Sequence, residues 1–147
     1  MIRYPLFFSA EVQSGTENAT PWPVKASGNQ SSCAIPEEFG GAGGAMSPED
    51  FFLLALSNCF LATFKVYSNA SHVKFSSVGI QAKLSIDKDP QNQPFAKSCD
   101  LKVSVGGVED PTRTITILKK VSRSGILLNS VKTEINFEFE INGEKIS

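Results

Sequence analysis

Residues 47–70 read SPEDFFLLALSNCFLATFKVYSNA, and this stretch decides the fold. Ser47 is a favourable N-cap and Pro48 suits the first helical position, so we expect one long helix to begin here. Two acidic residues follow in the first turn, where the helix dipole favours negative charge. Apolar residues then occupy most of the circumference, since residues 51–56 contain no polar side chain. The sequence therefore predicts a central helix that is buried on most of its sides.

This helix is expected to be too short and too interrupted to cross a membrane. A membrane-spanning helix needs about 20 consecutive, predominantly apolar residues. Here the apolar run is interrupted by Ser57, Asn58, Cys59, Thr63 and Lys65. We therefore expect the core helix of a soluble protein, with a cysteine at its centre.

Size and charge limit the classes of protein that fit. The chain has 147 residues, a length that predicts a single domain over residues 1–147. Its 14 basic and 15 acidic residues give no field that would attract nucleic acid or an anionic membrane. The first residues lack the long apolar core of a signal peptide, so we expect a cytoplasmic protein whose cysteines are thiols.

Alternating apolar and polar residues predict strands on both sides of the long helix. A second helix is expected to begin at Pro111, with Asp110 as its N-cap, and to end near Gly125. The order of elements predicts an α+β fold, with largely antiparallel sheets around the long buried helix. The expected strands cover residues 4–12, 22–28, 30–36, 77–87, 95–106 and 132–141.

Neither a metal ion nor another cofactor is expected. The three cysteines contain no C-x-x-C pair, and His72 is the only histidine, which is a poor set of zinc ligands. Four glycines precede the long helix, but they lack the Lys-Ser/Thr ending of a P-loop and the spacing of a dinucleotide fingerprint. We interpret this glycine-rich segment as a loop whose backbone approaches its neighbours closely.

Cys59 is the candidate reactive thiol. Its neighbours one helical turn away include Ala55 and Ala62, which are small enough for a molecule to approach the sulfur. Cys99 falls on the apolar face of its predicted strand, where a role in the core suffices. Cys33 lies near the glycine-rich loop, and its role stays open. No histidine is close to Cys59 in sequence, which argues against a Cys-His catalytic pair.

Glu49 is the carboxylate on the same helix that is of interest for this thiol. It precedes Cys59 by ten residues, or about 15 Å along a straight helix, so it is not expected to reach the sulfur of its own chain. A second copy of the helix, crossing in the antiparallel direction, would bring Glu49 of one chain towards Cys59 of the other. The apolar surface of the helix also requires additional cover, and both points favour a homodimer. Alternatively, Glu49 only complements the helix dipole.

Two stretches of the chain resemble the OsmC/Ohr family of osmotically inducible and organic-hydroperoxide-resistance proteins. Residues 40–64, GGAGGAMSPEDFFLLALSNCFLATF, resemble the family's central helix. They share its glycine-rich approach, its Ser/Asn-Pro-Glu start and a Cys-Phe pair ten residues after the glutamate. Residues 122–141, SRSGILLNSVKTEINFEFEI, resemble the end of the second helix and the last strand. The likeness covers nearly the whole chain.

The resemblance implies an intertwined homodimer of α+β subunits with two active sites at its interface. In active members, the cysteine that matches Cys59 attacks an organic hydroperoxide and becomes a sulfenic acid. The glutamate that matches Glu49 and an arginine hold the thiolate and orient the peroxide. A second cysteine then closes a disulfide, which an external dithiol reduces. Apolar walls in the family suit alkyl or fatty-acid hydroperoxides better than hydrogen peroxide.

The sequence departs from this pattern at two positions. The second cysteine aligns with Gly125, and a shift of one residue would place it at Ser124 instead. The arginine is expected in the N-terminal strands or in the loop before the helix, where the only arginine is Arg3. Lys25 is the nearest other cation, but an ammonium group does not reproduce a bidentate guanidinium.

Three interpretations follow. In the first, the chain is a one-cysteine reductase of organic hydroperoxides, with Cys59 as the nucleophile, Glu49 as the orienting carboxylate and an external thiol or dithiol as the reductant. Cys33 or Cys99 could replace the missing thiol, although no spacing supports either. In the second, a non-catalytic homodimer binds a small hydrophobic ligand. In the third, oxidation of Cys59 changes a contact with a partner, as in a redox sensor.

Overall fold

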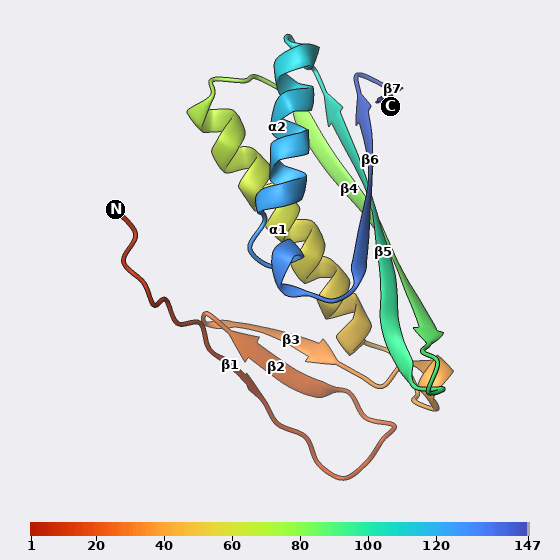
Figure 1. Ribbon diagram of the computed structural model, residues 1–147. Helices are drawn as coiled ribbons and strands as arrows, with labels where there is room; N and C mark the ends of the chain where they lie inside the picture. Colours follow the sequence, from red (N-terminus) through yellow and green to blue (C-terminus); the bar gives the residue numbers. More distant parts are fainter. Residues whose placement is uncertain (147) are drawn as a thin grey trace. The chain divides into compact units, whose positions relative to one another are not determined.

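A computed structural model describes residues 1–146, which form two compact units, residues 1–51 and residues 52–146. Figure 1 shows the elements of both units along the chain. The single domain expected from the length of the chain stays a prediction.

The first unit contains a three-stranded antiparallel sheet in the order β1-β2-β3. The strands are β1 (Ala10–Val12), β2 (Trp22–Ala26) and β3 (Asn29–Cys33). Ser27 and Gly28 connect β2 to β3 and both have positive φ, as a tight hairpin turn requires. The expected strand over residues 4–12 is reduced to β1. Pro5 has no N–H to donate to a ladder, and residues 4–9 pair with no strand within the described chain.

The same unit prepares the start of the long helix α1 (Pro48–Ala70). The Ser47 Oγ accepts a hydrogen bond from the Asp50 N–H at 3.1 Å, and the Asp50 carboxylate accepts one from the Ser47 N–H at 2.8 Å. This reciprocal cap confirms the predicted start. A short 3-10 turn, η1 (Glu37–Phe39), precedes the glycine-rich loop. A Cβ at Gly41 would overlap the carbonyl oxygen of Ile35, so this glycine permits the expected close approach of the backbone.

The second unit contains a four-stranded sheet in the order β4-β5-β6-β7. Its strands are β4 (Ser77–Lys88), β5 (Pro94–Gly106), β6 (Glu134–Ile141) and β7 (Glu144–Ile146). The β4–β5 and β6–β7 pairs are antiparallel, whereas β5 and β6 are parallel. This parallel pair, which the sequence did not predict, follows from the helical crossover of α2 (Pro111–Ser124) and the turn η2 (Leu128–Ser130). Strand β7 was not predicted either, because it is only three residues long.

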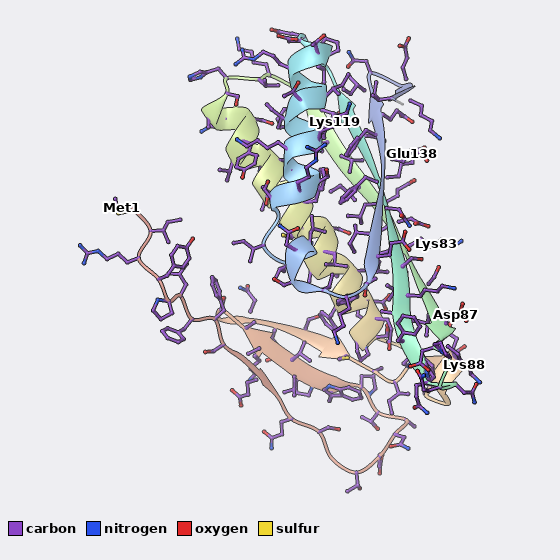
Figure 2. All side chains as sticks on the ribbon, in the orientation of Figure 1. Met1, Lys83, Asp87, Lys88, Lys119 and Glu138 are labelled. Atoms are coloured by element: carbon purple, nitrogen blue, oxygen red, sulfur yellow. The ribbon has the colours of Figure 1, made fainter. Side chains whose placement is uncertain are left out.

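Within the second unit, α1 and α2 lie on one face of this sheet (Figure 1). The buried stripe of α1 contains Leu56, Phe60 and Phe64, which join the apolar core with side chains of β5 and β6. The rings of Phe60 and Phe137 lie 5.6 Å apart between centroids. The opposite face of the sheet is polar, and Lys83 and Glu138 project from it (Figure 2). The predicted α+β fold is therefore confirmed.

Helix α1 differs from its prediction in two respects. Only one stripe of it is buried in this chain, while Leu54 and Val66 are 45% and 63% exposed, so burial on most sides is not achieved by the described residues alone. In addition, its length and composition are sufficient for a membrane span, so the expectation that it is too short and too interrupted was wrong on that ground. Its buried stripe nevertheless packs on the sheet, as the stripe of a core helix does.

Candidate thiol site

The packing of α2 against α1 positions the candidate site. The two helices run in opposite directions, because successive contacts along α2 meet earlier residues of α1. The Arg113 guanidinium donates a hydrogen bond to the Ser71 carbonyl oxygen at 2.7 Å, and the Lys120 ammonium lies 4.7 Å from the centre of the Tyr67 ring. Gly125, the residue that follows α2, then lies beside Cys59 in the middle of α1.

Gly125 lies near the sulfur of Cys59, with room for little more than one atom between them. A Cβ atom built on Gly125 would lie 3.3 Å from the Cys59 Sγ and 2.7 Å from Cδ1 of Leu128. The backbone of Gly125 has φ −65° and ψ 128°, which any L-residue adopts. Lack of space, and not the backbone conformation, therefore favours glycine here, and a larger residue requires Leu128 to shift.

Hydrogen bonds fix the turn that carries Leu128. The Asn129 N–H donates to the Gly125 carbonyl oxygen at 3.0 Å, and the Asn129 side-chain amide donates to the Arg123 carbonyl oxygen at 2.9 Å. The Ser130 hydroxyl donates to the carbonyl oxygen of Ile126. Leu128 itself is buried, with 6% of its surface exposed. Leu128 was not predicted as a residue of the site, because a leucine in an apolar run carries no signal that it lies near a cysteine.

The three cysteines have different environments. Cys33 and Cys99 are buried, and Cys59 is the one that is partly exposed. Burial raises the pKa of the Cys99 thiol, and the nearby Asp100 carboxylate raises it further. Burial also raises the pKa of the Cys33 thiol, an effect that the Ala34 N–H opposes and the Glu49 carboxylate reinforces. Both buried thiols are thus disfavoured as thiolates, which leaves Cys59 as the accessible one.

Glu49 lies in the first turn of α1, as predicted. Its Oε2 atom is inaccessible to solvent and has no hydrogen-bond partner among residues 1–146. A buried polar oxygen without a hydrogen-bond partner is unfavourable. The ten residues between Glu49 and Cys59 on the same helix correspond to a rise of about 15 Å. The chain therefore does not bring these two side chains together by itself.

The first unit contains an apolar groove that the sequence analysis did not predict. It has a volume of ≈580 Å³ and extends over one face of the three-stranded sheet. Lys25 on β2 borders it, and Arg3 lies in the exposed stretch before β1. The signal for the groove was the alternation of apolar residues along β2. Its apolar lining includes Val12, Trp22, Val24, Cys33 and Phe51.

Fold and site together define an α+β protein with one accessible thiol in the middle of a long helix. Residues 41–140 match the family model described as OsmC-like protein, and the chain belongs to this family. The resemblance found in the sequence is thereby confirmed. No curated protein matches the chain.

Solved structures of similar fold include three bacterial proteins. An OsmC-like protein of unknown function from Vibrio cholerae has a TM-score of 0.83 at 16% identity, covering 92% of this chain and 99% of that chain. The organic hydroperoxide resistance protein OsmC from Legionella pneumophila has a TM-score of 0.73 at 19% identity, covering 95% and 98%. An organic hydroperoxide resistance protein from Elizabethkingia anophelis has a TM-score of 0.74 at 17% identity, again covering 95% and 98%. At such identities, the likeness establishes the fold.

Proposed function

We propose that the chain is a cytoplasmic, thiol-dependent reductase of organic hydroperoxides, with Cys59 as its nucleophile. The observation that carries the proposal is the position of Cys59, the partly exposed cysteine of the three, on the long helix of an OsmC-like fold. Structures of similar fold include proteins of organic hydroperoxide resistance. The apolar core beside the site, which includes Leu128, favours an alkyl hydroperoxide over hydrogen peroxide.

The proposed reaction uses one cysteine of the protein. The Cys59 thiolate attacks the distal oxygen of the hydroperoxide, the O–O bond breaks, and the alkoxide leaves as an alcohol after taking a proton. Cys59 becomes a sulfenic acid. Position 125 carries no thiol, and the other two cysteines are buried. An external thiol therefore attacks the sulfenic sulfur, releasing water, and a second thiol reduces the mixed disulfide.

We further propose that the active form is a homodimer in which Glu49 of one chain serves Cys59 of the other. Two observations support the dimer. Outside its buried stripe, α1 exposes the apolar side chains of Leu54 and Val66. The Glu49 Oε2 atom has no partner within the described residues, so a second chain can supply one.

The peroxidase proposal is tested with purified protein and cumene hydroperoxide, in the presence of either a monothiol or a dithiol. The expected result is a mass gain of one oxygen at Cys59 without reductant, and turnover with reductant. Cys59→Ser should abolish both, whereas Cys99→Ser should retain both, because Cys99 is buried in the core. Peroxide consumption that is the same in Cys59→Ser and in the natural chain would contradict the proposal.

The apolar groove favours a second candidate function, the binding of a small hydrophobic ligand. Its ≈580 Å³ is within the range of small-molecule sites. If this function is the correct one, the protein should be inert towards cumene hydroperoxide and should bind a medium-chain fatty acid. Trp22 borders the groove, so its fluorescence reports binding. Val24→Glu, which places a charge on the groove face, should weaken that binding.

A further inference from the structure

We propose that Leu128 occupies the volume of the missing side chain at position 125 and thereby determines which thiols reach Cys59. The inference rests on Cys59 being the reactive thiol of the proposed function. Leu128 would then be a determinant of specificity, because it limits the side from which a resolving thiol can attack Cys59 and how bulky that thiol can be.

Leu128 and Cys59 both border the space beside Gly125. A Cβ atom built on Gly125 would lie 2.7 Å from Cδ1 of Leu128 and 3.3 Å from Sγ of Cys59. A Cβ contact below 3.0 Å requires a shift of the neighbouring atom, so Leu128 fills the space into which a side chain at 125 would extend. The space beside Cys59 on this side is thus occupied by a leucine methyl group instead of a second thiol.

Leu128 is held rigidly in this space. Leu128 is part of the apolar core and is 6% exposed, and hydrogen bonds from Asn129 and Ser130 hold its turn. A methyl group held in this way does not move aside as readily as an exposed side chain. A thiol that approaches Cys59 from the side of Gly125 therefore meets a fixed apolar wall.

The neighbouring residue Leu127 provides a matched comparison. It has the same side chain, precedes Leu128 directly and is 44% exposed, and no Leu127 atom is among the three nearest to the Cβ position of Gly125. Truncation of Leu128 should open space beside the sulfur, whereas truncation of Leu127 should not. The difference between the two variants separates local access to Cys59 from a general loss of apolar side chain.

The experiment introduces a thiol at position 125 and measures whether it reaches Cys59. The variants are Gly125→Cys alone, Gly125→Cys with Leu128→Ala, and Gly125→Cys with Leu127→Ala. Each is treated with the aromatic disulfide dithiobis(nitrobenzoate). The Cys59 thiolate attacks one sulfur of the reagent, forming a mixed disulfide and releasing one coloured thiolate. The introduced thiolate then attacks the Cys59 sulfur, closing a protein disulfide and releasing a second coloured thiolate.

The second release should be about tenfold faster with Leu128→Ala than with Leu127→Ala, a difference of about 1.4 kcal/mol in the barrier. Leu128→Ala alone should also raise the rate at which a bulky aromatic maleimide modifies Cys59. Cys59→Ser gives the background from the buried cysteines, and intact mass under non-reducing conditions separates disulfides within one chain from those between chains.

Equal rates of closure in the two double variants would overturn the proposal. If Leu128→Ala does not fold, Leu128→Val removes one carbon and should show the same order of rates with a smaller difference. Thiol exchange requires no peroxide chemistry. A protein that is inert towards hydroperoxides but shows the Leu128 effect would refute the proposed function and retain this inference.

Discussion

Gly125 lies near the sulfur of Cys59, and local crowding favours a residue without a side chain at this position. A side chain there would meet both the sulfur and the buried Leu128. The alignment of sequence motifs identified position 125, since the glycine stands where the family resemblance implies a thiol. It gave no indication that a leucine three residues later fills the vacated volume. At the scale of the residue, the surroundings of Cys59 are thus formed by neighbours that are distant from it in sequence.

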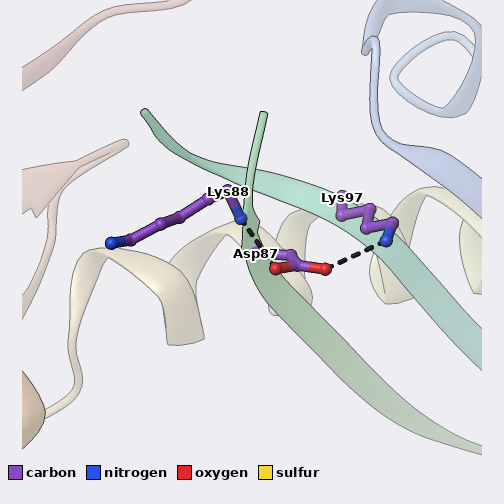
Figure 3. Close-up of polar contacts among 3 residues, drawn as sticks. All are labelled: Asp87, Lys88 and Lys97. Atoms are coloured by element: carbon purple, nitrogen blue, oxygen red, sulfur yellow. Dashed lines mark hydrogen bonds and ion pairs between the residues drawn. The ribbon is translucent and has the colours of Figure 1, made fainter. Parts of the chain in front are cut away.

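Asp87 provides a residue-scale prediction on pH. The hydrogen bond from the Lys97 ammonium, at 2.9 Å, lowers the pKa of the Asp87 carboxyl, and the Lys88 backbone N–H lowers it further (Figure 3). Lys97→Met should therefore raise the pKa of Asp87 towards its ordinary value, as measured by NMR titration of the carboxyl. Lys88→Met should leave it nearly unchanged, because Lys88 contributes its backbone and not its ammonium group.

The direction of the associated stability effect follows from linkage. A carboxyl whose pKa is lower in the folded than in the unfolded state stabilises the fold at pH values above its unfolded-state pKa. This stabilisation disappears as the pH falls through the pKa of the same carboxyl in the folded state. This contribution to stability should therefore be lost below pH 3.8, the ordinary pKa of an aspartate carboxyl. The pair is exposed, so salt should weaken the effect. An equal rise of the Asp87 pKa in both lysine variants would contradict this assignment.

At the scale of the element, α1 combines a buried stripe with two exposed apolar side chains, Leu54 and Val66. Leu56, Phe60 and Phe64 recur at intervals of four residues and pack on the sheet of the second unit. The cap formed by Ser47 and Asp50 fixes where the helix begins. Local sequence determines both features, since capping and periodicity require no information about distant residues.

Phe64→Ala tests the contribution of the buried stripe. Phe64 is fully buried and its ring lies 5.2 Å from that of Phe75. Its truncation should lower the free energy of unfolding by about 3–5 kcal/mol. Phe95→Ala makes the same chemical change at a residue that is 44% exposed, and should cost no more than about 1 kcal/mol. Urea denaturation at one fixed protein concentration provides the comparison, and similar losses would contradict the assigned core.

At the scale of the whole molecule, the exposed apolar residues are the feature that requires explanation. They include Leu54 and Val66 on α1 and Phe7 and Phe8 before β1. Large exposed apolar surfaces mark interaction sites in soluble proteins. The proposed homodimer accounts for them, and it also supplies the second chain that the unpartnered Glu49 oxygen requires.

Mixed dimers test whether Glu49 serves the partner. Cys59→Ser and Glu49→Gln chains should each have little peroxidase activity as pure dimers. When the two variant chains are unfolded and refolded together in equal amounts, random pairing gives one chain of each kind in half of the dimers. If Glu49 acts across the interface, each of these mixed dimers contains one intact site. The mixture should then regain about a quarter of the activity of the natural chain.

Three results would contradict this arrangement. A mixture that remains inactive would show that Glu49 acts within its own chain, and a fully active Glu49→Gln dimer would show that it does not act at all. Light scattering after size-exclusion chromatography should give twice the 15.9 kDa of one chain, and a monomer at that mass would rule out the shared site.

The sequence by itself determined the start and length of α1, the extent of β4, β5 and β6 to within two residues, and the family to which the chain belongs. These features depend on caps, on periodicity and on motifs, all of which are local in sequence. The parallel pairing of β5 with β6, the absence of a ladder before Ala10 and the place of Leu128 beside Cys59 were decided only by the tertiary structure. Each depends on which segments, distant in sequence, share the same space, and alternation of residues along one strand does not encode its partner.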